Sequence, residues 1–182
     1  MRCNVLADVR VFAGANNALM IAATALIMMS CAGSKTTAHD PNEKMERGWI
    51  ERSAMMKPDY PKFRESFDTL RVDKNFVEMM KTLHTDIEIL VVLGTWCSDS
   101  KREVPRFWKI ADLASIPSAA IKYYAVDRTK KSADGLTDNY KIERVPTFIF
   151  LKRGNEVGRI VESPKNSLEE DMLVILADAQ NK

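Results

Sequence analysis

The chain has 182 residues, of which 46% are hydrophobic and 29% are charged, as is typical of a globular domain with short appendages. Its 27 Lys and Arg residues nearly balance its 25 Asp and Glu residues. The composition therefore gives no basic surface for a nucleic acid, and we expect no nucleic-acid partner. The chain has three cysteines, too few for a disulfide-rich scaffold.

An uncharged apolar stretch near the amino end indicates a secretion signal. Arg2 and Arg10 precede residues 18–29, which are all apolar or small, and Cys31 follows shortly after them. This stretch is shorter than the roughly 20 residues that cross a bilayer, so a permanent transmembrane helix is the weaker interpretation. The residues around Cys31 resemble the cleavage site of bacterial lipoproteins, which implies that residues 1–30 are a signal peptide.

The same resemblance implies that Cys31 becomes the lipidated first residue of the mature chain. Residues 31–43 would then comprise the lipidated cysteine and a flexible polar tether. We expect an exported protein that a lipid on Cys31 anchors to a bacterial cell membrane, in the periplasm or cell envelope. Two alternatives stay open: translation starts at Met20 or another Met, or the apolar stretch is an uncleaved tail. Loss of Cys3 and lipidation of Cys31 would leave Cys97 as the single free thiol.

Residues 44–86 carry apolar residues at helical spacing. These residues recur at positions i, i+4 and i+7 from Phe63 and again from Phe76, which predicts two or three short helices. Asp73 is a candidate N-cap for the last of them. His84 follows that helix without a second ligand at metal-binding spacing, so we expect no metal site there. The sequence thus predicts a helical extension ahead of the main domain.

Residues 87–182 alternate between strand and helix patterns. The apolar run at residues 87–93, which only Glu88 interrupts, is typical of a strand buried on both faces. The order β-α-β-α-β-β-α contains one β-α-β unit, whose strands should be parallel. In chain order we predict a strand at 87–93, a helix at 99–113, a strand at 120–126, a short helix near 134–140, a hairpin of strands 147–152 and 156–161 around Gly154, and a final helix capped by Ser167.

Cys97 lies where the first strand gives way to a helix, a position that suits a reactive thiol. Unpaired backbone N–H groups and the positive end of the helix dipole favour a thiolate there. Trp96 offers an apolar wall for a partner, and the Ser100 hydroxyl is placed to donate a hydrogen bond to the sulfur. Asp99 disfavours a second negative charge, and Lys101 opposes that effect. The alternative is a small buried cysteine without chemistry.

Three features that include these residues resemble the thioredoxin family. They are the WCSDSK segment at residues 96–101, Pro105 inside the following helix, and the Val-Pro-Thr segment at residues 145–147. The resemblance covers about residues 87–179. It implies a thioredoxin-like α/β fold at residues 87–182, with three layers, α/β/α, around a mixed central sheet, and the helical extension before it.

The resemblance also implies roles for individual residues. Cys97 would be exposed at the edge of the first strand and its helix, beside Pro146 as the family's cis-proline. Backbone groups before that proline pair with an extended partner peptide in the family, so Val145 is a candidate contact by strand addition. The candidate substrate-binding residues are therefore Trp96, Val145, Pro146 and Thr147.

Two departures from the family pattern change the expected chemistry. A dithiol oxidoreductase uses a second cysteine to resolve its mixed disulfide, but this chain has Ser100 there, whose hydroxyl is a poor nucleophile. Val91 also replaces the acidic residue that thioredoxins bury six positions before the nucleophile. The candidate catalytic residues are Cys97 and Ser100, and an external thiol would release the partner. Residues 94–112 and 126–132 more closely resemble a group of exported bacterial thioredoxin-like proteins.

These observations support two hypotheses of different classes. In the first, Cys97 of a membrane-tethered exported protein exchanges with protein or small-molecule thiols and disulfides, as a monothiol oxidoreductase or isomerase. In the second, the chain is a non-catalytic peptide-binding or chaperone module with the same fold. A glutaredoxin-like iron–sulfur carrier ranks third, because CSDS differs from that family's motif. We expect no cofactor and no metal, and the residues that a peroxidase or a hydrolase needs are not evident.

Overall fold

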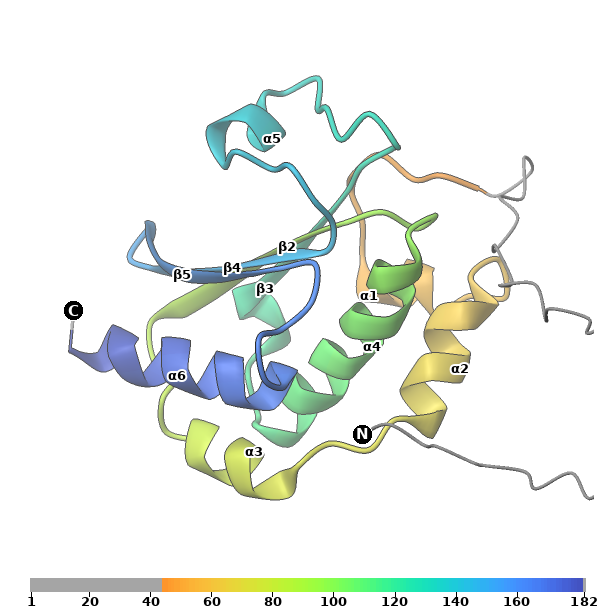
Figure 1. Cartoon of the computed structure of the whole chain (residues 1–182). Helices are drawn as coiled ribbons and strands as arrows, with labels where there is room; N and C mark the ends of the chain where they lie inside the picture. Colours follow the sequence, from red (N-terminus) through yellow and green to blue (C-terminus); the bar gives the residue numbers. More distant parts are fainter. Residues whose placement is uncertain (1–43, 182) are drawn as a thin grey trace, which may run out of the picture. The chain divides into compact units, whose positions relative to one another are not determined.

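The computed structural model describes residues 44–181, which form a mixed sheet with helices on both of its faces (Figure 1). The strands lie in the order β1-β3-β2-β4-β5. They are β1 (Gly48–Trp49), β2 (Ile87–Leu93), β3 (Ile121–Ala125), β4 (Thr147–Lys152) and β5 (Asn155–Val161). The helices are α1 (Arg52–Met55), α2 (Pro61–Thr69), α3 (Lys74–Met80), α4 (Ser98–Leu113), a 3₁₀ turn (Ser118–Ala120), α5 (Leu136–Asn139) and α6 (Leu168–Gln180). From β2 onward, the element order is the predicted one.

Pairing within the sheet confirms the predicted β-α-β unit. β2 and β3 are parallel, with Val91 opposite Tyr123, and helix α4 connects them. On its other side β2 pairs antiparallel with β4, which continues into β5 as a hairpin. The two turn residues, Arg153 and Gly154, have φ values of 53° and 81°, the left-handed region that glycine adopts most easily.

The core has two parts because β2 is covered on both faces. Ile89 and Leu93 point into the larger hydrophobic cluster, which helices α1 to α4 and α6 complete. Leu90 and Val92 point into a smaller cluster on the opposite face, where Cys97 also lies. Figure 1 shows α5 on one side of the sheet and α3, α4 and α6 on the other. The predicted three-layer α/β/α arrangement is confirmed.

Both predicted N-caps form. The Asp73 carboxylate accepts a hydrogen bond from the Asn75 N–H at 2.9 Å and caps α3. The Ser167 hydroxyl accepts from the Glu170 N–H at 3.1 Å and caps α6. These are short-range signals, which explains why the sequence reveals them.

Residues 44–86 form the expected short helices, α1 to α3, and also a strand that the sequence does not predict. They include β1, which pairs antiparallel with β3 and places Gly48 opposite Ala125. They also enter the larger cluster, where Met55, Phe63 and Met80 are fully buried. A two-residue strand that begins at a glycine carries no alternating pattern, so the sequence gives no sign of it. The extension is therefore packed into the same core as the rest of the described chain.

The predictions for the signal peptide, the Cys31 lipid and the tether concern residues 1–43, which lie outside the described residues. Among residues 44–181, every helix is too short or too polar to span a bilayer.

Candidate functional site

Cys97 is the N-cap of α4, at the predicted junction of strand and helix. Its φ and ψ are −81° and 128°, and its N–H donates to the Gly94 carbonyl at 2.9 Å. That bond closes a turn of four residues between the end of β2 and the start of α4. The Cys97 carbonyl accepts the Lys101 N–H at 3.0 Å, the first bond of the helix.

The expectation that Cys97 is exposed is wrong. Its relative exposure is 9%, and it belongs to the smaller hydrophobic cluster, against which Trp96 and Tyr140 also pack. Its thiol donates a hydrogen bond to the Val145 carbonyl, with Sγ 3.2 Å from the oxygen. The sulfur forms no capping bond with the helix N–H groups. A partner therefore has to reach a thiol whose hydrogen is already directed at the protein backbone.

The segment at residues 145–147 lies against the thiol as the resemblance implies. The Val145–Pro146 peptide bond is cis, and the Pro146 carbonyl accepts the Glu162 N–H at 2.7 Å. Val145 is 4% exposed, and its N–H donates no hydrogen bond to any of residues 44–181. Thr147 is 2% exposed and its hydroxyl donates to the Arg144 carbonyl at 2.7 Å. The Thr147 side chain is therefore committed to the fold rather than available to a substrate.

Ser100 is fully buried, and its oxygen accepts the Gly94 N–H at 3.2 Å. The predicted hydrogen bond from its hydroxyl to the Cys97 sulfur does not form within the described part of the chain. Asp99 forms an ion pair with Arg102 at 2.7 Å, so its charge is partly compensated beside the thiol. Ser100 thus acts on the Gly94–Cys97 turn, and through it on the position of the sulfur.

Trp96 forms a packed wall beside the turn. Its indole Nε1 donates to the Val126 carbonyl at 2.8 Å, and the Arg128 guanidinium lies 4.6 Å from its ring centroid. Gly94 lies directly against the ring, because a Cβ placed there would be 2.7 Å from the indole Cε2. A side chain on Gly94 would therefore displace the Trp96 ring.

Sequence reasoning missed three residues at this site: Gly94, Thr95 and Arg128. Gly94 directly follows the predicted strand at residues 87–93, and glycine at that point allows close approach of a neighbour. Thr95 is 1% exposed and bonds to residues about 50 positions away, which no local pattern reveals. Arg128 lies in the segment 126–132, which resembles exported bacterial thioredoxin-like proteins, but that resemblance implies no role for Arg128.

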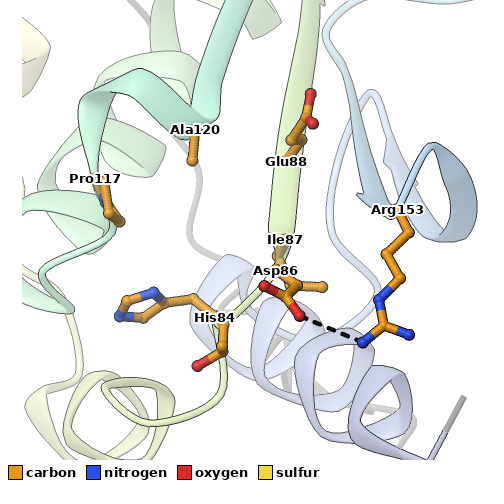
Figure 2. A pocket seen from close by; sticks show the side chains of 8 residues that line it. His84, Asp86, Ile87, Glu88, Pro117, Ala120 and Arg153 are labelled. Atoms are coloured by element: carbon orange, nitrogen blue, oxygen red, sulfur yellow. Dashed lines mark ion pairs between the residues drawn. The ribbon is translucent and has the colours of Figure 1, made fainter.

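A second feature of the surface is an open pocket of about 610 Å³ at the opposite end of β2 (Figure 2). His84, Ile87 and Pro117 contribute to its lining, as do Asp86 and Arg153, which form an ion pair at 3.5 Å. Among residues 44–181, no group of three or more His, Cys, Asp or Glu side chains is arranged to hold a metal ion. The pocket is separate from the thiol site, because β2 begins at one and ends near the other.

Comparison with known proteins now identifies the fold. The family model described as thioredoxin matches residues 48–176, which is well over half of the chain. The chain belongs to the thioredoxin family. The match begins at β1, ahead of the resemblance at residues 87–179 that the motifs carry. Membership indicates thiol–disulfide redox chemistry in general.

Individual relatives are distant. Thioredoxin H5 of Arabidopsis thaliana is 24% identical over 98 residues, which cover 53% of this chain and 78% of that protein. Thioredoxin H2 of the same plant is 30% identical over 80 residues, which cover 42% of this chain and 53% of that protein. Among solved structures, the thioredoxin of Fasciola hepatica has a TM-score of 0.35 at 18% identity and covers 60% of this chain and 93% of that one.

Proposed function

We propose that this protein carries out thiol–disulfide exchange through Cys97 alone. The observation that carries the proposal is the placement of the thiol at the start of α4, 3.2 Å from the carbonyl that precedes the cis-proline Pro146. Membership of the thioredoxin family supports the same class of chemistry.

The proposed exchange proceeds in two steps. The Cys97 thiol loses its proton, and the thiolate attacks one sulfur of a partner disulfide. A disulfide forms between Cys97 and that sulfur, while the other sulfur leaves as a thiolate and takes up the proton. An external thiol then attacks the mixed disulfide, binds the partner's sulfur and restores the Cys97 thiol. The external thiol is required because Ser100 stands where a resolving cysteine would be, and a hydroxyl does not resolve a disulfide.

The partner peptide would lie beside the cis-proline in an extended conformation. A carbonyl of the peptide can accept a hydrogen bond from the Val145 N–H, which donates none to residues 44–181. The Val145 carbonyl becomes free to accept a peptide N–H once the thiol has lost its hydrogen. Loss of the thiol proton and strand addition by a peptide would thus favour each other.

The test is turnover of a peptide that carries a glutathione disulfide, with reduced glutathione as the external thiol. The wild-type protein should release the free peptide, and Cys97→Ser should release none above the uncatalysed rate while keeping the wild-type unfolding midpoint. Ser100→Cys should add insulin reduction with dithiothreitol as the reductant, because it supplies a resolving thiol. Equal rates for the wild type and Cys97→Ser would contradict the proposal.

We also propose that the protein is exported and held to a bacterial cell membrane by a lipid on Cys31. This proposal rests on the layout of residues 1–30 and on the polar segment 31–43, which would be the tether. Intact mass of the protein expressed in a bacterial host tests it. The wild type should begin at Cys31 with an added diacylglyceryl mass, whereas Cys31→Ala should carry no lipid. An unchanged mass shift in Cys31→Ala would reject the anchor.

The burial of Cys97 favours a second candidate function, a peptide-binding module without redox chemistry. A thiol that is 9% exposed and bonded to Val145 suits a residue that holds the fold together. In that case peptide affinity should survive Cys97→Ser and fall in Trp96→Ala, as measured by calorimetry with an unstructured peptide. Unchanged affinity in Trp96→Ala would count against this function.

A further inference from the structure

Residues 44–50, which we call the strap, run from the edge of the sheet to the turn that carries Cys97. At one end of the strap, β1 pairs with β3 and the Ile50 N–H donates to the Tyr123 carbonyl at 3.1 Å. At the other end, the Thr95 hydroxyl donates to the Lys44 carbonyl at 3.0 Å and accepts the Glu46 N–H at 3.2 Å. The hydroxyl of the buried Thr95 therefore joins the strap to the turn at residues 94–97, which we call the thiol turn.

Thr95 is the second residue of the turn that the Gly94–Cys97 hydrogen bond closes. With the strap in place the Thr95 side chain is 1% exposed, and both hydrogen-bond partners of its hydroxyl belong to the strap, so a strap that moved away would break both bonds. Trp96 and Cys97 follow Thr95 directly. The conformation of this turn sets where Sγ lies relative to the Val145 carbonyl, because only one residue separates Thr95 from Cys97.

The strap is itself held from both sides. The Glu46 carboxylate accepts a hydrogen bond from the Tyr60 hydroxyl and forms an ion pair with Lys44 at 3.0 Å. Arg47 forms an ion pair at 2.7 Å with Asp127, whose neighbour Arg128 lies over the Trp96 ring. The strap thus contacts both segments that flank the thiol, residues 94–97 and residues 126–128.

We propose that the strap, acting through Thr95, is a positioning element for Cys97 that keeps Sγ against the Val145 carbonyl. The effect of the strap on thiol–disulfide exchange rests on the proposed function. Its effect on the position of the Cys97 sulfur does not, and can be measured without a partner. Release of the strap would loosen the turn and expose the sulfur more often.

The test is the rate at which iodoacetamide alkylates Cys97 in the folded full chain, at one pH, followed by peptide mass mapping. Thr95→Val keeps the shape of the side chain and removes both hydrogen bonds to the strap. We expect it to raise the rate by about fivefold or more, because local opening governs access to a buried thiol. Thr95→Ser keeps the hydroxyl and should react at the wild-type rate.

A matched control separates positioning from a general loss of stability. Asp73→Ala removes the N-cap of α3, which destabilises the protein, and among the described residues Asp73 has no hydrogen bond or ion pair with the thiol turn. It should lower the unfolding midpoint and leave the alkylation rate within about twofold of wild type under native conditions. Equal acceleration by Asp73→Ala and Thr95→Val would overturn the proposal, as would a wild-type rate in folded Thr95→Val.

Arg47→Ala provides a second variant should Thr95→Val fail to fold, because the Arg47 side chain is 72% exposed. It breaks the ion pair to Asp127 and should raise the alkylation rate by about twofold or more. An unchanged rate would overturn the proposal. Failure of the exchange assay described above would reject the proposed function and leave these rates unaffected, so the two failures are distinguishable.

Discussion

At the scale of single residues, the absence of a side chain at Gly94 determines the packing of the thiol turn. The Trp96 ring occupies the space where a Cβ would stand, and in that position its Nε1 reaches the Val126 carbonyl. The Gly94 N–H also donates to Ser100, one turn into α4. Gly94 therefore both contacts the Trp96 ring and donates a backbone hydrogen bond to Ser100.

Gly94→Ala should lower the free energy of unfolding by about 1–3 kcal/mol, because the new methyl group forces the indole from its place. Chemical denaturation of the wild type and the variant measures this loss. In the Trp96→Ala background the same substitution should cost clearly less, because the ring is gone. An equal cost in both backgrounds would show that the clash with Trp96 is not its cause.

The same residues show what the sequence could predict at this scale. The place of Cys97 at a helix start follows from a local change of pattern, and the structure confirms it. Its burial depends on Val145, which lies 48 positions further along the chain. A contact between residues so far apart in the sequence leaves no local pattern around Cys97. The burial of Cys97 therefore could not be predicted from the residues beside it.

At the scale of elements, the strap is stabilised by a charged group that titrates in acid. The hydrogen bond from Tyr60, followed by the hydrogen bond from Lys44, lowers the pKa of Glu46 below its ordinary value of 4.5. Burial and the same carboxylate raise the pKa of Tyr60 to about 12, so its hydroxyl keeps the donated proton throughout the acid range. A carboxylate with a lowered pKa in the folded state stabilises the protein above its unfolded pKa and loses that effect as the pH falls.

Glu46→Gln should therefore be less stable than the wild type by on the order of 1 kcal/mol at pH 7, since a partly exposed charged hydrogen bond is lost. The difference in free energy of unfolding should shrink as the pH falls below the ordinary carboxyl pKa of 4.5 and through the lower pKa of the folded state, where the wild-type carboxyl group also becomes neutral. Urea titrations of both proteins between pH 7 and pH 3 measure it. A difference independent of pH would contradict this role of the carboxylate.

Elements also differ in how far the sequence predicts them. Strand β2 has the bounds that its apolar run indicates, residues 87–93, because a strand buried on both faces carries a strong local signal. Strand β1 is only two residues long and exists through its pairing with β3. Its position becomes evident only when the distant strand is in place.

At the scale of the whole molecule, residues 44–86 and the later elements share one core. The Phe63 ring lies 5.8 Å from that of Trp108, centroid to centroid, and both residues are fully buried. Tyr60 packs edge-on against the same phenylalanine. We therefore expect the extension and the sheet to unfold together.

Phe63→Ala should reduce the free energy of unfolding by about 3–5 kcal/mol, because it leaves a cavity beneath α4. Met79→Ala is a control in the same extension, since Met79 is 59% exposed, and it should change stability by less than about 0.5 kcal/mol. Denaturation followed by tryptophan fluorescence and by circular dichroism should give one coincident transition. Separate transitions, or a small loss in Phe63→Ala, would show that the extension folds independently.

The central claim, that Cys97 exchanges with disulfides in the folded protein, is tested most directly by trapping the mixed disulfide. The reduced protein would be incubated with oxidised glutathione, quenched with acid, and analysed by intact mass and peptide mapping. We predict one glutathione on Cys97, removed by added thiol and absent from Cys97→Ser. A folded wild-type protein that acquires no adduct on Cys97, while the urea-unfolded protein does, would contradict the claim.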